Sequence, residues 1–113
     1  VLSNKHGPSC RRVCEHLGIG PLLKGVFGAR DTPWIKPQPE FTSHVLSRLG
    51  AEARSTLMIG DSPFDVQASL NGNLAACWCV TTGTHSADQL FQAGSNRVFS
   101  DLWALQEELE KTP

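Results

Sequence analysis

Short apolar runs alternate with helix-like stretches along the chain. Residues 57–59 form an apolar run that stops at Gly60 and an acidic residue. A run of this length that ends at a glycine is typical of a strand buried in a parallel sheet. In the stretch 39–49, apolar residues recur at helical spacing, with Pro39 suited to the first turn and Gly50 to the end. The pattern therefore predicts strands and helices in turn.

The predicted elements follow one another at regular intervals. The predicted strands end at residues 3–4 or cover 23–27, 57–59, 74–80 and 97–99, and the predicted helices cover 9–17, 39–49, 63–70, 87–93 and 102–109. Strands that alternate with helices at this spacing favour parallel pairing through helical crossovers. We therefore expect an α/β fold: a three-layer α/β/α sandwich around a Rossmann-like, mainly parallel sheet.

Length and charge narrow the function classes. The chain has 113 residues and a formal net charge of -1, which suits one domain and gives no overall field that would attract nucleic acid or an anionic membrane. No apolar segment approaches the roughly 18 residues that span a bilayer, and no signal-like stretch follows Val1. These features predict a soluble, cytoplasmic protein with neither a nucleic-acid nor a membrane partner.

The cysteines carry little chemistry of their own. Four are present: Cys10, Cys14, Cys77 and Cys79. They would allow two disulfides or a zinc site, but the first two are four residues apart on a predicted helix and the last two are two apart on a predicted strand. Neither pair has the spacing of a zinc knuckle. We expect reduced structural thiols, as in a cytosolic protein.

A small polar cluster follows the first strand. Ser3 offers a hydroxyl group, and the backbone from Asn4 onward offers N–H groups at the strand end. Such a cluster suits a phosphate group, although the same residues also form ordinary turns and helix caps.

Lys36 lies on a conformationally restricted segment just before the predicted helix 39–49. Pro37 disfavours a helical conformation at Lys36, and Pro39 can begin the next helix. Stiffness suits a positioned charge, whereas most lysines are only solvated. Because Trp34 precedes Lys36 closely, we expect it to border any site formed there.

Two acids follow the buried strand 57–59. Asp61 comes directly after Gly60, and Asp65 lies four residues further on, within the first turn of the next predicted helix. Two carboxylates in this arrangement suit Mg²⁺, which prefers hard oxygen ligands together with water and phosphate oxygens. The alternative is a pair of acids that only stabilise the helix N-terminus.

The three clusters occur in an order that resembles a known family. The segments "VLSN", "IKPQPE" and "GDSPFD" resemble motifs two, three and four of the haloacid dehalogenase-like (HAD) hydrolase superfamily, most closely its phosphoglycolate phosphatase branch. The similarity continues through "VFGARD" and "VTTGTHSADQLFQAGSNRVFSDLWAL". It therefore extends over nearly the whole chain.

The resemblance implies a role for each polar residue. Ser3 would donate a hydrogen bond to a phosphoryl oxygen, with help from the backbone of Asn4, and Lys36 would neutralise charge on the phosphoryl group. Asp61 would bind Mg²⁺ directly, and Asp65 would be a further ligand or act through a bound water. The implied reaction is hydrolysis of a small phosphorylated metabolite, such as a phosphoglycolate-like monoester, through an aspartyl-phosphate intermediate.

The family's first motif, an apolar strand followed by Asp-x-Asp, is absent. None of the five aspartates is separated from another by a single residue. We therefore expect residues 1–113 to be a partial catalytic core domain, without the strand that carries the nucleophile and without the cap domain, and inactive alone. Two alternatives stay open: a phosphosugar mutase with the same motifs, and a non-catalytic relic that acts as a binding or interaction module.

The missing strand has a structural consequence. In the resembled fold it lies between the strand that ends at Ser3 and the strand that ends at Ile59. Its absence should leave an incomplete sheet that closes by direct pairing, keeps an open slot, or borrows a strand from another molecule. The open sheet would thus permit self-association.

Overall fold

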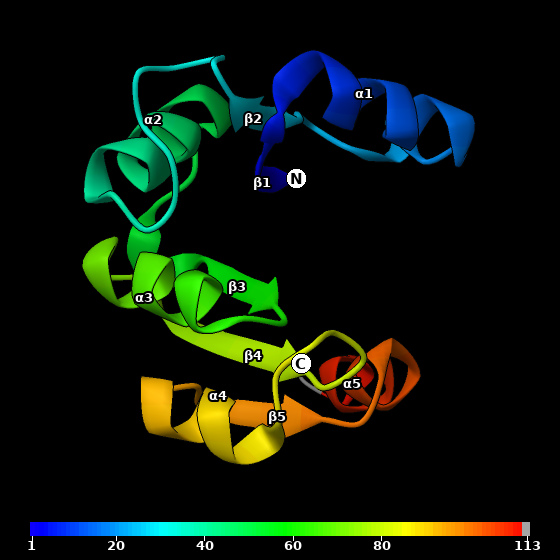
Figure 1. Ribbon diagram of the computed structural model, residues 1–113, viewed down its shortest axis with the longest axis vertical. Helices are drawn as coiled ribbons and strands as arrows, with labels where there is room; N and C mark the ends of the chain where they lie inside the picture. The colour runs from blue at the N-terminus through cyan, green and yellow to red at the C-terminus, as the bar shows by residue number, and fades with distance from the viewer. Residues whose placement is uncertain (112–113) are drawn as a thin grey trace.

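All paired strands run parallel, in two small sheets. The computed structural model describes residues 1–111. β3 (Leu57–Gly60), β4 (Ala76–Val80) and β5 (Arg97–Phe99) form one sheet in this order, and β1 (Leu2–His6) pairs with β2 (Phe27–Ala29) in the other. The two sheets lie toward opposite ends of the molecule (Figure 1). The predicted parallel α/β class is confirmed, in an incomplete form.

Most helices contact a strand that is next to them in the sequence. The helices are α1 (Gly7–His16), α2 (Pro39–Leu49), α3 (Pro63–Asn71), α4 (Ala87–Ala93) and α5 (Leu102–Glu110), with short 3₁₀ turns at Gly20–Leu22 and Ala53–Ser55. α1 contacts β1 and β2, α3 contacts β3 and β4, and α5 contacts β4 and β5. α2 contacts α3 and so connects the two halves. Among residues 1–111, no helix combines the length and apolarity that crossing a membrane requires.

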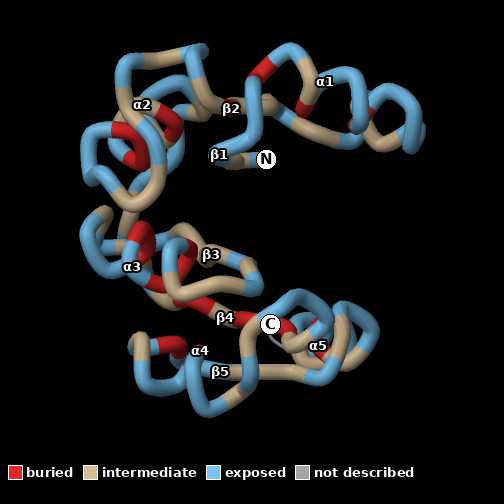
Figure 2. Tube along the Cα trace, viewed as in Figure 1, coloured by how far each residue is buried: buried red, intermediate tan, exposed pale blue. Residues whose placement is uncertain are grey.

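The buried core lies around β4. Its centre consists of Val66, Cys77, Cys79 and Leu90, with Met58, Ala93 and Val98 packed against them. Figure 2 shows the buried segments concentrated at α3 and β4 and, separately, at α1 and α2. All four cysteines are buried, and none of them is paired in a disulfide in this structure.

Helix α2 begins and ends where its sequence predicts. Pro39 occupies the first turn, and Gly50 ends the helix with φ at 65°, in the left-handed region that favours glycine. Phe41 and Val45 are buried at helical spacing. The apolar face of α2 therefore packs inward and holds the segment before it in place.

The predicted strand 23–27 is wrong in its bounds, since β2 covers Phe27–Ala29. Gly28, just beyond the predicted end of the strand, lies inside β2. A Cβ atom there would come 2.4 Å from the carbonyl oxygen of Lys5, so only glycine lets β2 approach the junction of β1 and α1. The glycine thus marks close packing rather than a turn.

Within residues 1–111, β1 and β3 each pair on one side only, and not with one another. Of the three outcomes expected for the incomplete sheet, the structure shows the open slot, without direct pairing of β1 and β3. Val1 and Leu2 nevertheless share an apolar hollow of about 150 Å³ with Leu57, Met58 and residues of α2. The hydroxyl of Thr42, which lines this hollow, is the one buried side-chain polar atom of the described chain without a hydrogen-bond partner.

Candidate active site

The loop after β3 is folded around Asp65. Ser62 caps α3 by accepting a hydrogen bond from the Asp65 N–H at 3.4 Å. In return, Asp65 Oδ2 accepts hydrogen bonds from the backbone N–H groups of Asp61 at 3.0 Å and Ser62 at 3.1 Å. Gly60 makes this possible, because a Cβ atom there would lie 2.4 Å from the Asp65 side chain. The loop therefore directs the Asp61 side chain away from this network.

Asp65 also forms an ion pair with Lys36. The Lys36 Nζ and Asp65 Oδ1 atoms are 2.5 Å apart, and the two side chains are only 14% and 8% exposed. Burial acts to raise the pKa of Asp65, but the hydrogen bond and the charge of Lys36, with the N–H groups of Asp61 and Ser62, lower it below its ordinary value. Asp65 is thus held ionised and keeps the ammonium group of Lys36 in place.

The backbone of Lys36 is hydrogen-bonded to Asn4, in the middle of β1. Asn4 Nδ2 donates to the Lys36 carbonyl at 3.1 Å, and the Lys36 N–H donates to Asn4 Oδ1 at 2.8 Å. The Ser3 hydroxyl oxygen accepts a hydrogen bond from the Lys5 N–H at 3.0 Å, which leaves its proton available for another acceptor. Lys36 therefore links β1 to the first turn of α3.

A pocket of about 370 Å³ collects these groups. Its lining residues are Leu2, Lys36, Ile59, Gly60, Asp61, Asp65, Val80, Thr82 and Leu102. The structure thus brings Lys36, Asp61 and Asp65 together. Ser3 and Asn4 do not line the pocket, and they reach it only through the hydrogen bonds between Asn4 and Lys36.

The loop after β4 forms a further wall of the pocket, as expected for a strand-end loop beside the site. Thr82 lines the pocket, and a Cβ atom on Gly83 would lie 2.5 Å from Asp61 Oδ2. The threonine-rich stretch after a predicted strand is the one sequence signal for this wall. No comparable signal exists for Leu2 or Leu102, which tertiary packing brings to the pocket.

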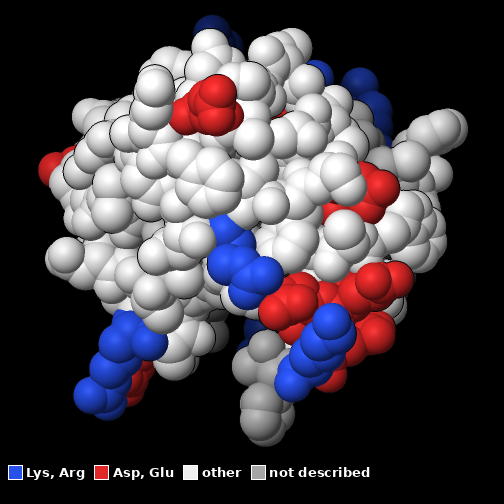
Figure 3. All heavy atoms as spheres, turned by 90° about the horizontal axis from the view of Figure 1, so that it is seen from below, with Lys and Arg blue, Asp and Glu red and all other residues white. Residues whose placement is uncertain are grey.

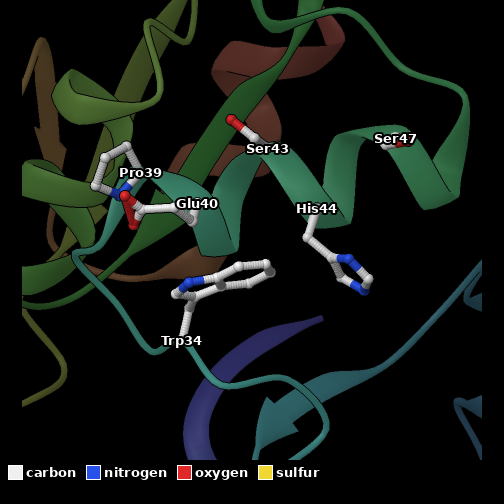
Figure 4. A pocket seen from close by; sticks show the side chains of 6 residues that line it. All are labelled: Trp34, Pro39, Glu40, Ser43, His44 and Ser47. Carbon is white, nitrogen blue, oxygen red and sulfur yellow. The ribbon is translucent and has the colours of Figure 1, made fainter.

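Trp34 does not border the pocket, contrary to expectation. It lines a different hollow of about 460 Å³ with Pro39, Glu40, Ser43, His44 and Ser47, and Figure 4 shows its indole ring lying beside the α2 residues. The ring centroids of Trp34 and His44 are 6.1 Å apart. Trp34 thus packs toward α2, while the chain turns at Ile35 and Lys36 toward the acidic loop.

The free carboxylate of the site is that of Asp61. Its oxygens accept no hydrogen bond from any residue of 1–111, whereas both oxygens of Asp65 are engaged. Within the same residues, no group of three or more His, Cys, Asp or Glu side chains could hold a metal. One free carboxylate fits Mg²⁺, which is commonly held by one or two carboxylates together with water and phosphate oxygens.

The family follows from a direct comparison. Residues 1–79 match the family model described as haloacid dehalogenase-like hydrolase. The chain belongs to the haloacid dehalogenase-like hydrolases. This confirms the resemblance inferred from the order of the three motifs.

Individual relatives indicate which branch of the superfamily the chain resembles. The chain is 34% identical to "Probable phosphatase IndB" of Dickeya dadantii, over 92% of this chain and 44% of the relative. It is 30% identical to a phosphoglycolate phosphatase of Rhodospirillum rubrum, over 93% of this chain and 43% of the relative. A solved structure described as "putative phosphoglycolate phosphatase from Lactobacillus delbrueckii subsp. bulgaricus" superimposes with a TM-score of 0.83 at 26% identity, covering 96% of this chain and 45% of that one. The chain thus spans less than half the length of these relatives.

Proposed function

We propose that the chain is part of a Mg²⁺-dependent phosphatase that hydrolyses a small, phosphoglycolate-like phosphate monoester. The observation that carries the proposal is the pocket in which a buried lysine and a free carboxylate converge. A cation and a metal-binding acid at one strand end suit a phosphoryl group with its metal. The printed names of the relatives, phosphatase and phosphoglycolate phosphatase, support the same reaction.

Each residue of the site has a defined part in this proposal. Lys36 offsets negative charge on the phosphoryl oxygens, and Asp65 positions its ammonium group. Asn4 holds the backbone of Lys36 in place, and because neither Ser3 nor Asn4 lines the pocket, the proposal gives them no direct contact with the phosphoryl oxygens. Asp61 holds Mg²⁺, which when bound offsets charge on the phosphoryl group. The engaged oxygens of Asp65 favour its positioning role over direct ligation of the metal.

The proposed nucleophile is an aspartate outside this chain. Asp61 and Asp65 are the carboxylates of residues 1–111 that line the pocket. Both have other roles, because Asp61 holds the metal and Asp65 positions Lys36. We place the nucleophile on a strand, in a longer protein, that inserts between the open edges of β1 and β3. The unpartnered hydroxyl of Thr42 in the hollow between the two sheets supports such an insertion.

The metal assignment is tested in that longer protein. Asp61→Asn should abolish hydrolysis of p-nitrophenyl phosphate while the circular dichroism spectrum stays unchanged, because the exposed Asp61 side chain makes no contact that folding needs. Asp88→Asn, an equal change at an exposed acid that does not line the pocket, should retain activity. Near-normal turnover by Asp61→Asn at limiting Mg²⁺ would refute the assignment.

A phosphosugar mutase would use the same pocket residues, Lys36, Asp61 and Asp65, but would form a different product. A phosphatase releases inorganic phosphate from a sugar monophosphate, whereas a phosphosugar mutase returns an isomeric sugar phosphate. Phosphate release measured beside isomer formation on one substrate therefore decides between them.

A further inference from the structure

A basic, partly apolar hollow lies along the outer face of α1. It measures about 400 Å³, and its lining residues are Lys5, Ser9, Arg12, Val13, His16 and Leu17. Val13 and Leu17 are 46% and 62% exposed. None of the ion pairs among residues 1–111 uses Lys5 or Arg12. Glu15, the one acid of α1, is not part of the lining. The face is thus an unpartnered apolar strip with positive charge along it.

Helix α5 carries the complementary pattern. Leu102 and Trp103, in its first turn, are 58% and 77% exposed. Glu107 and Glu110 follow one and two turns later on the same exposed side, and no ion pair of the described chain uses them. Figure 3 shows acidic side chains gathered on one side of the end of the molecule at which α5 lies, with Lys and Arg side chains beside them; Arg97 and Lys111 pair with Glu108 of the same helix. This helix face is apolar at its start and acidic toward its end.

The two faces match when the helices run antiparallel. Leu17 and Val13 then lie against Leu102 and Trp103, and Arg12 and Lys5 lie near Glu107 and Glu110. The span from Arg12 to Leu17 and the span from Trp103 to Glu107 are both about 6 to 8 Å at 1.5 Å per residue. Apolar groups therefore meet apolar groups where opposite charges also meet.

Within one molecule the helices cannot meet, because α1 and α5 lie on the same side but at opposite ends of the long axis (Figure 1). A two-fold axis between them places α1 of each copy against α5 of the other. Such an interface is self-complementary, and both helix pairs form at once. We propose that the chain forms a symmetric dimer through reciprocal α1–α5 packing. Leu102 belongs both to this interface and to the lining of the candidate active site, so the interface borders that pocket.

Charge reversal in this 113-residue chain tests the dimer. Arg12→Glu should weaken dimerisation, measured by sedimentation equilibrium, by roughly tenfold or more, because it places two acids opposite each other. Glu107→Arg should do the same by placing two bases together. The double variant Arg12→Glu with Glu107→Arg restores the opposite charges in both helix pairs, so it should dimerise like the wild type. Arg48→Glu, an exposed α2 variant with the same charge change, should have no effect.

The apolar part of the proposed interface is tested by a separate variant. Trp103→Ala should weaken the dimer at high salt as well, where the charge effects are screened. Pairing of the open β1 and β3 edges between copies would leave the dimer insensitive to Arg12→Glu and Trp103→Ala. That result, or a chain that stays monomeric up to about 1 mM, would overturn the proposal.

Discussion

At the residue scale, the Lys36–Asp65 pair is the most sheltered charge interaction of the site. Asp65→Asn should lower the free energy of unfolding by about 3 kcal/mol at pH 7, since it leaves the Lys36 ammonium group without its carboxylate. The exposed pair of Arg54 and Glu52 provides the control, because Glu52→Gln should cost less than about 1 kcal/mol. Urea unfolding of the three proteins measures both values.

The same pair predicts a pH dependence with a definite sign. The folded state lowers the pKa of Asp65, so the stabilisation is fully present above the unfolded pKa of about 3.9 and is lost as the pH falls through the lower folded value. The difference between wild type and Asp65→Asn should therefore shrink below about pH 4. A difference that stays constant from pH 7 to pH 3 would mean that Lys36 does not stabilise the ionised carboxylate.

Lys36 itself is predicted to act on the reaction. In the longer protein, Lys36→Ala should lower kcat by about 100-fold or more, the scale expected for loss of one positioned electrostatic group. Lys24→Ala removes an exposed lysine remote from the pocket and should leave kcat unchanged. An unaltered kcat for Lys36→Ala would show that Lys36 is structural.

At the element scale, the strands differ in how many neighbours they have. β4 is paired on both sides, whereas β1 is paired with β2 alone. Backbone amides of β4 should therefore exchange with deuterium more slowly than those of β1. Equal protection in the two strands would indicate that the sheets unfold as one unit and that the edge of β1 is not open.

Most elements could be predicted from the sequence because their ends carry local signals. The helices 39–49 and 87–93 have the predicted bounds, since proline, serine and glycine at their ends are helix-capping signals, and the strand 97–99 also has its predicted bounds. The bounds of β2 could not be predicted, because Gly28 is required by a close approach between distant segments.

The sequence predicted which residues belong to the site but not how they contact one another. Motif order identified Lys36, Asp61 and Asp65, which line one pocket. The pairing of Lys36 with Asp65 joins residues 29 positions apart, and such contacts depend on packing that periodicity does not encode. For the same reason, proximity in sequence to Lys36 gave the wrong environment for Trp34.

At the scale of the whole molecule, the chain combines a charged pocket with an incomplete sheet. Lys36 and Asp61 can recruit a phosphate group and a cation, but no group of residues 1–111 is assigned to attack phosphorus. The links between the two halves include the packing of α2 on α3, the hydrogen bonds and ion pair of Lys36, and the hydrogen bond from Asn71 to the Pro37 carbonyl. We therefore expect the 113-residue chain to be marginally stable and to bind without turnover.

Hydrolysis of p-nitrophenyl phosphate with Mg²⁺ tests this account most directly, when the 113-residue chain is compared with a form extended upstream of Val1. The account predicts that the short chain gives only the metal background and that the extended form turns over, with Asp61→Asn abolishing that turnover. An inert extended form would favour the non-catalytic relic. Saturable, Mg²⁺-dependent turnover by the short chain, removed by Asp61→Asn, would contradict the claim that the nucleophile lies outside it.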